Sequence, residues 1–584
     1  MSEREPSSLV TDPANDGAVF EQGSADRRSS ASPTGVETAP GRRRRGARST
    51  REPQGAARGS WFPRIAATLL SLQLLALLAA SAYQFAHYDV GSDFATYAQA
   101  WWLIGHGHLD PYSTTLASPF LANQAQLLLW PLALLEPLFP SGLTLLWLED
   151  AAIVATNVLT LVWAERVVDE RRTAPSRRRT VLRSLALISI VLSPWVYETA
   201  LFSFHVEPFV GLFAVAAGLA AWTGQTRWLW IAVPLLLATG VVGLLAAAGL
   251  GLALLVGPRT ERTAGAVVLL CAAAWLVGLS TIGLVGGGAT IFSRSLGYLD
   301  LPSGQRVGAV ALGLHVLTHL GATLSVLVAH LPILAVFLIP VGLVGVATRW
   351  GGAMVLTLML PPALLTGMMS LTLVVAVQVW PALPFVLVGS VMILLGAPNQ
   401  QVEERRGPAQ DPSPRPSAAS RIGLPLRAAF LAWLTFLLVL DLVIVRDVLG
   451  SSFLYIPSGT AEQLQRVQAR IPVDAEVIGT PGEIGRFAMR PAVTSTLYSG
   501  ESVHVTRGVV VFVLVLGSGT SADATFGAKV EEKLHARLLS LTDGVATLVW
   551  HPGRLGGELG FPSATYRTAA ATSRQPGGRA SGRG

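Results

Sequence analysis

The sequence predicts an all-α polytopic membrane bundle of about eleven transmembrane helices, followed by a small extracytoplasmic α/β domain. Three observations predict this fold class. The chain is 51% hydrophobic and only 14% charged, whereas a soluble globular protein is usually about 25% charged. Apolar runs long enough to cross a bilayer recur between residues 65 and 446. After residue 450 the hydrophobic runs shorten to the length of strands.

The formal net charge of +7 does not indicate a nucleic-acid partner. The arginines gather in short stretches between apolar segments, which is the charge pattern of membrane topology and not of a binding face. The single cysteine, Cys271, excludes a disulfide within one chain and a cysteine-based metal site. Composition therefore indicates lipid as the main environment of the chain.

Residues 1–60 are predicted to form a disordered cytoplasmic tail. They are rich in Ser, Pro, Gly and Arg, include the run Arg42 to Arg45, and contain too few apolar residues to fold. The first apolar run begins too far into the chain for an ordinary signal peptide. The basic run is expected to set orientation, and binding to anionic lipid headgroups is the alternative.

Charge placement orients the transmembrane domain, 61–449. Arg64 precedes the first span, 65–86, so the loop 87–142 is expected outside. Residues 121–138 are apolar and could cross, but we expect them to lie along the outer face. The reason is that the next span, 143–165, leads into an arginine-rich loop from Arg166 to Arg183, which belongs in the cytoplasm.

The remaining apolar runs continue the same alternation. They are 184–201, 208–224, a short pair at 228–239 and 241–256, 264–285, 320–346, 351–370, 376–396 and 426–446. A cytoplasmic linker, 397–424, precedes the last span, which leaves the C-terminus outside.

The region 450–562 is predicted to be a small α/β domain. Its runs at 476–479, 509–516 and 545–550 have the length and composition of buried strands. Residues 460–470 and 525–541 are predicted to form flanking helices. The tail 563–584 is rich in Gly, Ser and Arg and is predicted to be disordered.

The first outer loop carries a specific arrangement of residues. Asp89 and Asp93 follow the first span, an amphipathic aromatic stretch with Tyr97 and Gln99 comes next, and a turn ends at Pro111-Tyr112. This arrangement resembles the start of GT-C membrane glycosyltransferases, which use lipid-linked sugars. In that superfamily an acidic residue of this loop is typically catalytic, so the resemblance implies that role for Asp93.

A closer resemblance covers most of the chain. A bacterial family of predicted membrane proteins of unknown function has a D-L-G-x-x-x-Q-A-x-W loop, a P-L-x-x-L-F-P-S segment, an F-D-F-H-x-E element and an I-P-x-D-A-x-V segment. This chain matches them with Asp93 to Trp102, Pro137 to Ser141, Phe202 to Glu207 and Ile471 to Val477. The family looks GT-C-like, which implies a bacterial plasma-membrane location.

The chain departs from the family pattern at three polar positions. A Lys-Glu-Asp triplet is replaced by the uncharged stretch 239–242, the aspartate of F-D-F-H is Ser203, and a His-Tyr pair is Val379-Trp380. These losses favour the alternative of a catalytically inactive relative.

The resemblance and the topology together suggest a site on the outer side. The predicted catalytic residues are Asp93, His205 and Glu207, and the predicted substrate-binding residues are Asp89, Tyr97, Gln99, Arg294 and Arg306. Transfer of a sugar from a polyprenyl phosphate requires a carboxylate to accept the proton of the acceptor hydroxyl. It also requires cations or a metal beside the leaving phosphate.

Plainer interpretations stay open for the same residues. Asp89 and Asp93 could cap a helix, and His205 and Glu207 could simply pair with each other. His315 and His319 share a helix face but lack an adjacent third ligand, so no metal site is assigned and a divalent metal stays an alternative. Glu149 and Asp150, within a predicted span, are expected to face the bundle interior or to mark its outer end.

Three functions are compatible with these sequence features. The first is a GT-C-like glycosyltransferase whose partners are a polyprenyl-phosphate sugar or other lipid and the membrane. The second is an inactive protein that binds lipid-linked glycan or acts as a scaffold for envelope assembly. The third is a transporter, for which the short pair 228–256 is the only indication and contains no charge.

Overall fold

The computed structural model describes residues 61–170, 176–281, 296–299, 309–365, 377–396, 432–433, 435–440, 442–443, 456–495, 502–516, 521–561 and 563–568. The chain divides into two compact units, Met1–Ser60 and Trp61–Gly584. All of the described residues belong to the second unit. The predictions for 1–60 and for most of 426–446 and 563–584 concern residues outside the described ranges.

The multi-pass prediction is confirmed, because six helices in the described ranges are long and apolar enough to cross a membrane. They are Phe62–Ala86, Leu143–Glu170, Ser176–Leu201, Arg259–Thr281, Leu320–Val341 and Val377–Leu394. Three shorter apolar helices, Glu207–Trp222, Thr226–Ala238 and Val241–Leu255, pack with them. The count of eleven crossings stays a prediction.

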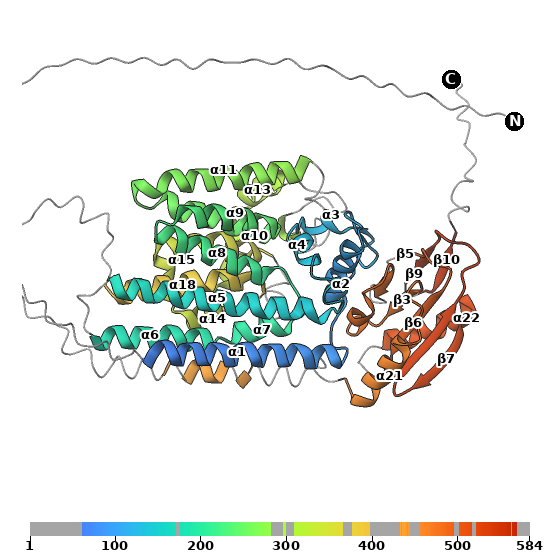
Figure 1. The fold of residues 1–584 in the computed structure, drawn as a ribbon. Helices are drawn as coiled ribbons and strands as arrows, with labels where there is room; N and C mark the ends of the chain where they lie inside the picture. The colour runs from blue at the N-terminus through green and yellow to red at the C-terminus, as the bar shows by residue number, and fades with distance from the viewer. Residues whose placement is uncertain are drawn as a thin grey trace, which may run out of the picture. The chain divides into compact units, whose positions relative to one another are not determined.

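These segments carry the labels of Figure 1, where they run side by side. The labels are α1 (Trp61–Ala86), α5 (Leu143–Glu170), α6 (Ser176–Val191), α7 (Pro194–Leu201), α8 (Glu207–Trp222), α9 (Thr226–Ala238), α10 (Val241–Leu255), α11 (Arg259–Thr281), α14 (Leu320–Leu338) and α18 (Leu383–Leu394).

The apolar stretch 121–138 does not form a spanning helix, as expected. It contains only α3 (Phe120–Gln124) and α4 (Leu129–Ala133), each of five residues. A helix that crosses a bilayer needs about 20 residues. Both short helices lie within the loop 87–142, for which the outer-face position stays a prediction.

Two predicted spans are irregular, one with a break at a proline and the other with a π-helical turn. The span predicted at 184–201 consists of α6 and α7, and α7 begins at Pro194, a residue that fits the first turn of a helix. The span predicted from 351 consists of α15 (Arg349–Met354), a π-helical turn (Val355–Met359) and α16 (Leu360–Ala363). Residues 366–370 of that span lie outside the described ranges.

Aromatic side chains and glycines hold the bundle core together. The Trp163 ring meets the rings of Trp350 and Phe385 edge to face, with centroids 5.2 Å and 5.5 Å away. Gly218 lets α8 approach this cluster, since a Cβ there would lie 2.7 Å from the Trp163 ring. Such close packing sets the positions of the helices that carry the candidate site.

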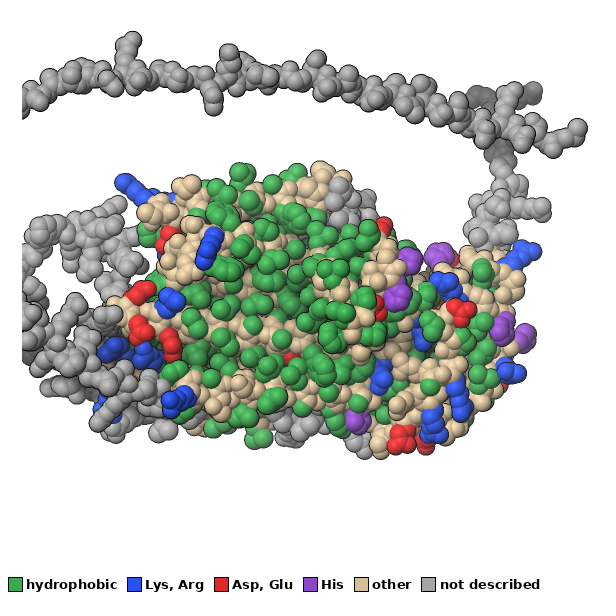
Figure 2. Space-filling view, viewed as in Figure 1, with side chains coloured by type: hydrophobic (Ala, Val, Ile, Leu, Met, Phe, Trp, Pro, Cys, Tyr) green, Lys and Arg blue, Asp and Glu red, His purple; other side chains and the backbone are tan. Residues whose placement is uncertain are grey.

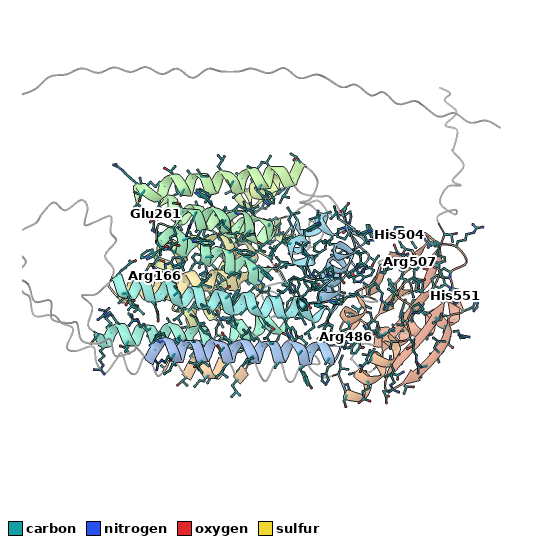
Figure 3. The ribbon with its side chains drawn as sticks, in the orientation of Figure 1. Arg166, Glu261, Arg486, His504, Arg507 and His551 are labelled. Carbon is teal, nitrogen blue, oxygen red and sulfur yellow. The ribbon has the colours of Figure 1, made fainter. Side chains whose placement is uncertain are left out.

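A hydrophobic belt covers the bundle surface between two ends that carry charged side chains (Figure 2). Arg166 and Glu261 lie at one end, and Arg486, His504, Arg507 and His551 lie in the sheet domain at the other (Figure 3). Arg349, predicted to be cytoplasmic, pairs with Glu261 at the first end at 2.6 Å. Arg166, Glu261 and Arg349, which were predicted to lie on the cytoplasmic side, are therefore at the end opposite the sheet domain.

The predicted C-terminal sheet domain is present. Five strands have the order β4-β3-β6-β8-β7, with β4 (Val493–Ser495), β3 (Glu476–Gly479) and β6 (Val510–Val515) parallel and β8 (Val545–Trp550) and β7 (Arg537–Thr542) antiparallel. A three-stranded antiparallel sheet has the order β10 (Thr565–Arg567), β9 (Glu558–Gly560) and β5 (Ser502–His504). Two helices, α21 (Ser458–Gln468) and α22 (Ser521–Leu534), complete it.

One element of this domain was predicted wrongly. Residues 525–541 were expected to be a single helix, but α22 ends at Leu534 and residues 537–542 form strand β7. The reason is the turn Asp543-Gly544, with φ of 50° and 75°, which pairs β7 with β8 as a two-residue hairpin. An Asp-Gly pair between apolar runs is a strong hairpin signal. Strand β10 also lies beyond residue 562, where the tail was predicted to begin.

The strand β6 is buried on both faces because its side chains alternate between two cores. Val511, Val513 and Val515 join a core with α21 and the outer loop. Val510, Phe512 and Leu514 join a second core with α22 and the small sheet. Successive side chains of a strand point to opposite faces, so a continuous apolar run is what this position requires.

Candidate functional site

The outer loop and the sheet domain share one hydrophobic core at the end of the bundle. The helix α2 (Ser92–Gly105) lies between the bundle and the sheets (Figure 1). The Gly485 amide donates to the Val90 carbonyl at 2.8 Å, and the Tyr88 hydroxyl donates to Gln468 Oε1 at 2.5 Å. The sheet domain is therefore directly attached to the loop that carries the predicted catalytic aspartate.

Asp93 occupies the first turn of α2 and is exposed. The N-cap residue of α2 is Gly91, with no side-chain capping bond, so neither Asp89 nor Asp93 is the cap. An acidic residue in the first turn still interacts favourably with the helix dipole. Among the described residues, no hydrogen bond or ion pair occupies the Asp93 carboxylate.

Tyr97 marks the centre of a group of acidic side chains. Its ring meets those of Phe204 and His205 edge to face, with centroids 5.3 Å and 5.8 Å away. Burial raises the pKa of Tyr97 well above its ordinary value, and the charges of Glu207, Asp93 and Glu149 raise it further, against a hydrogen bond with Gln126. The phenol therefore stays neutral.

The corner between α7 and α8 delivers His205 and Glu207 to this group. Ser203 in this corner has φ of 95°, a conformation that costs an L residue free energy. The His205 amide donates to Glu149 Oε1 at 3.2 Å, and its ring Nδ1 lies 3.0 Å from the Ser203 carbonyl. The His205 ring also stacks on Phe202 at 4.7 Å.

Buried carboxylates surround this corner. Glu207 begins α8, and Glu149 and Asp150 come from α5. One oxygen of each is buried without a hydrogen-bond partner among the described residues. The other oxygen of Asp150 accepts from the Ser81 hydroxyl at 2.8 Å. Unpaired buried carboxylate oxygens are costly unless a ligand or a proton meets them.

A second pair of carboxyl groups lies at the contact with the sheet domain. Burial, together with the charge of Glu483, raises the pKa of Asp89 to about 8. Asp89 comes from the outer loop and Glu483 from the turn before the 3-10 helix Ile484–Phe487. Beside them Arg486 lies over the Phe85 and Tyr88 rings, at 4.6 Å and 4.3 Å.

Of the remaining predicted site residues, Gln99 is bonded within the protein, and the two arginines lie outside the described residues. The Gln99 amide donates to Thr114 Oγ1 at 2.7 Å and to the Pro491 carbonyl at 3.2 Å, and its oxygen accepts from the Thr114 amide at 3.0 Å. These bonds attach α2 to the sheet domain, and a substrate contact for Gln99 stays a prediction. Arg294 and Arg306 lie outside the described residues.

No group of three or more metal-ligating side chains occurs among the residues that the structure describes. His315 in α13 (Ala309–Thr318) and His319 stack on each other with ring centroids 6.0 Å apart. Among the described residues, none is therefore assigned as a ligand of the divalent metal that was considered as an alternative.

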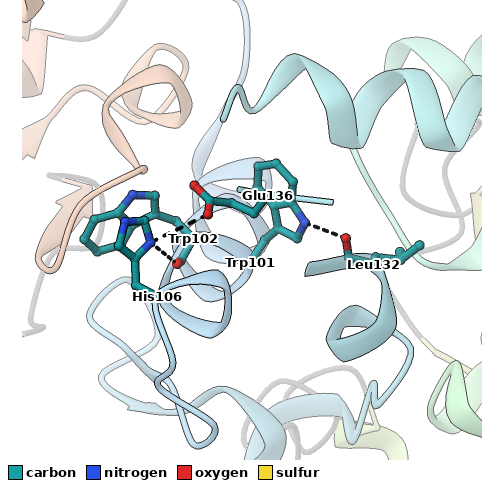
Figure 4. Close-up of polar contacts among 5 residues, drawn as sticks. All are labelled: Trp101, Trp102, His106, Leu132 and Glu136. Atoms are coloured by element: carbon teal, nitrogen blue, oxygen red, sulfur yellow. Dashed lines mark hydrogen bonds and ion pairs between the residues drawn. The ribbon is translucent and has the colours of Figure 1, made fainter. Parts of the chain in front are cut away.

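Glu136 is a buried acid that sequence reasoning missed (Figure 4). Its carboxylate lies 3.7 Å from His106 Nδ1, and burial raises its pKa while His106 lowers it. Nearby, Trp101 Nε1 donates to the Leu132 carbonyl at 3.1 Å. These contacts connect α2 with α4 and hold the outer loop in shape.

Comparison with known proteins identifies the family. Residues 84–409, more than half of the chain, match the family described as "Predicted membrane protein (DUF2079)". The chain belongs to this family. The family match includes the outer loop and the Phe202–Glu207 element, and it ends before the sheet domain that supplies Glu483.

The structure of this DUF2079 member also has a likeness to two crystal structures of ArnT from Cupriavidus metallidurans. The apo structure is 14% identical, with a TM-score of 0.42, and the match covers 83% of this chain and 98% of that chain. The structure bound to undecaprenyl phosphate is 13% identical, with a TM-score of 0.41, and the match covers 84% and 97%. No curated protein matches the chain.

Proposed function

We propose that this DUF2079 protein is a GT-C-like glycosyltransferase that uses a polyprenyl-phosphate-linked sugar at the outer face of the bacterial plasma membrane. One observation carries the proposal. Tyr97, in the same helix as Asp93, contacts the His205 ring edge to face, and the amide of His205, two residues before Glu207, donates to Glu149. Ionisable groups gathered at one end of a membrane bundle are functional candidates.

In the proposed reaction, Asp93 is the general base. The acceptor hydroxyl oxygen attacks C1 of the sugar while its proton passes to the Asp93 carboxylate. The bond between C1 and the phosphate oxygen breaks, and its electron pair stays on the polyprenyl phosphate. Asp93 suits this role because it is exposed and no protein group among the described residues occupies its carboxylate.

His205 and Glu207 are proposed to act at the same centre. The backbone amide of His205 donates to Glu149, and its Nδ1 faces the Ser203 carbonyl, so Nε2 is the ring nitrogen that a ligand would meet. The imidazole, with Arg294 and Arg306 as predicted cations, would contact the leaving phosphate. Glu207 follows two residues later, at the start of α8.

The orientation is part of the proposal. The arginine-rich loops meet at the bundle end opposite the sheets, and positive loops face the cytoplasm. The N-terminus would then be cytoplasmic, and the outer loop, the site and the sheet domain would be extracytoplasmic.

The experiment is transfer from lipid-linked sugars in membranes that contain Asp93→Asn. Loss of general base catalysis should lower turnover about 10²- to 10⁴-fold. Asp110→Asn is the matched control, because Asp110 is exposed on the same loop. Full turnover in Asp93→Asn would exclude Asp93 as the base.

A second candidate is a catalytically inactive protein that binds lipid-linked glycan or supports envelope assembly. Val379 and Trp380, which replace the His-Tyr pair of the family, are buried in the apolar bundle core. The replaced triplet follows Ala238, whose carbonyl accepts from the Leu128 amide at 2.8 Å, so the lost charges would lie beside the outer loop. Turnover of any lipid-linked sugar above background by the purified protein would rule this candidate out.

A further inference from the structure

A groove of about 570 Å³ lies on the sheet domain. Its walls come from α22, the end of β8 and the segment that includes β10. The lining residues are Lys533, Leu534, Trp550, Ala564, Thr565, Tyr566 and Arg567. Its volume falls within the range of about 300–1,000 Å³ that is usual for ligand sites.

The aromatic wall of the groove is rigid. The Trp550 and Tyr566 rings meet edge to face with centroids 4.9 Å apart. The Tyr566 hydroxyl accepts from the Gly557 amide at 3.3 Å and donates to the Arg554 carbonyl. A Cβ at Gly557 would lie 2.5 Å from the Tyr566 ring, so only glycine allows this approach. The tyrosine ring is therefore held at its hydroxyl end and along one side.

The two charged residues that line the groove are both cationic, and Glu558 of β9 is the cross-strand partner of one of them, Arg567. Lys533 and Arg567 lie on different elements, α22 and β10, and both are exposed. None of the described residues that line the groove is acidic. Two cations from separate elements beside an ordered aromatic pair are a suitable surface for a ligand that carries both negative charge and apolar C–H faces.

We infer that this groove binds an anionic glycan, a sugar chain that carries carboxylate or phosphate groups. Arg567 and Lys533 would bind the anionic groups, with the guanidinium able to bind two oxygens at once. The Tyr566 ring would pack against a sugar ring. A compact inorganic anion would use the cations but not the ring, so the aromatic wall favours a glycan over phosphate alone.

This inference goes beyond the proposed function, because binding in the groove requires no sugar transfer at Asp93. The groove lies among α22, β8 and β10, whereas Asp93 lies in α2, so the two sites use separate residues. A glycan bound there would be held at the extracytoplasmic face predicted for this domain.

The test uses the full-length protein in phosphatidylcholine nanodiscs, with binding measured by microscale thermophoresis. The probes are hexagalacturonate, which is a carboxylate-bearing glycan, maltohexaose, which is neutral, and tripolyphosphate, which has charge without a sugar. Hexagalacturonate should bind most tightly. The double variant Lys533→Ala/Arg567→Ala should weaken its binding about tenfold or more, since two charge-assisted contacts are lost.

The matched control is Lys529→Ala/Arg537→Ala, which removes the same charges from α22 and from strand β7 without touching the groove. It should leave the hexagalacturonate affinity unchanged. Tyr566→Leu tests the ring and should weaken hexagalacturonate binding but not tripolyphosphate binding. Thermal denaturation of each variant shows whether it is folded.

Three results would overturn the inference. Hexagalacturonate binding that is unchanged in the double variant would place the ligand elsewhere. An equal loss of hexagalacturonate affinity in the Lys529→Ala/Arg537→Ala control would indicate a general attraction between opposite charges. Tripolyphosphate binding as tight as hexagalacturonate binding, with no effect of Tyr566→Leu, would show a simple anion site in place of a glycan site.

Discussion

The stability of the contact between the outer loop and the sheet domain should depend on pH, and replacing Asp89 by Asn should remove a large part of that dependence. Asp89 is 7% exposed, its Oδ2 has no hydrogen-bond partner among the described residues, and Glu483 from the sheet domain acts on it. Burial and Glu483 raise its pKa from 3.8 to about 8. The buried site thus favours the protonated acid.

The direction of the pH effect on the free energy of unfolding depends on whether the folded or the unfolded chain binds the proton more tightly. Between about pH 4 and pH 8 the folded protein keeps Asp89 protonated, whereas the unfolded chain releases the proton. The free energy of unfolding therefore falls as the pH rises across this window and levels off above it. At about 1.36 kcal/mol for each pH unit between the two pKa values, the loss is at most roughly 6 kcal/mol. Water entering the contact would reduce it to a few kcal/mol.

The assay is thermal denaturation in detergent at pH 4.5 and pH 8.5, together with hydrogen exchange of residues 480–488. Asp89→Asn should match the wild type at the lower pH and exceed its melting temperature by several degrees at the higher pH. Glu483→Gln should give a smaller effect in the same direction, because burial is the larger cause. Asp474→Asn, an exposed change on the same domain, is the control.

Two results would refute this reasoning. One is a wild-type melting temperature that rises steadily from pH 5 to pH 8 while Asp89→Asn rises in parallel. The other is an equal stabilisation by Asp89→Asn at both pH values, which would indicate a packing effect unrelated to ionisation.

Three further substitutions test the packing of the site. Gly485→Ala should lower stability by about 1–3 kcal/mol, because its Cβ would lie 2.4 Å from the Val90 carbonyl; an unchanged melting temperature would show that the contact is loose. Ser203→Gly should raise stability by about 1 kcal/mol by relieving the φ of 95°, and a lower melting temperature would contradict the strain argument. Gln99→Leu should cost about 1–3 kcal/mol, because the Thr114 amide and the Pro491 carbonyl lose their bonds to Gln99 while the Thr114 hydroxyl keeps its bonds to the Val493 backbone; proteolysis between the outer loop and the sheet domain should increase, and resistance equal to the wild type would count against it.

The candidate site was only partly predictable. Asp93, His205 and Glu207 could be singled out because acidic and histidine side chains at the ends of apolar runs are unusual and match a family pattern. Glu149 was noticed as a charge within a span, but its role was not assigned. Its contact with the His205 amide joins residues 56 positions apart, and no local pattern records such a pairing.

The sequence by itself determined the membrane class, the six long apolar helices and the strands predicted at 476–479, 509–516 and 545–550, since hydropathy and periodicity act over a few consecutive residues. The Asp543-Gly544 hairpin was also readable from local chemistry, although it was missed. Only the tertiary structure decided that Gly91 caps α2, that Gln99 is bonded to the sheet domain, and that Asp89 faces Glu483. These arrangements depend on how distant segments pack against one another, and that packing sets which polar groups lose water and which find a partner.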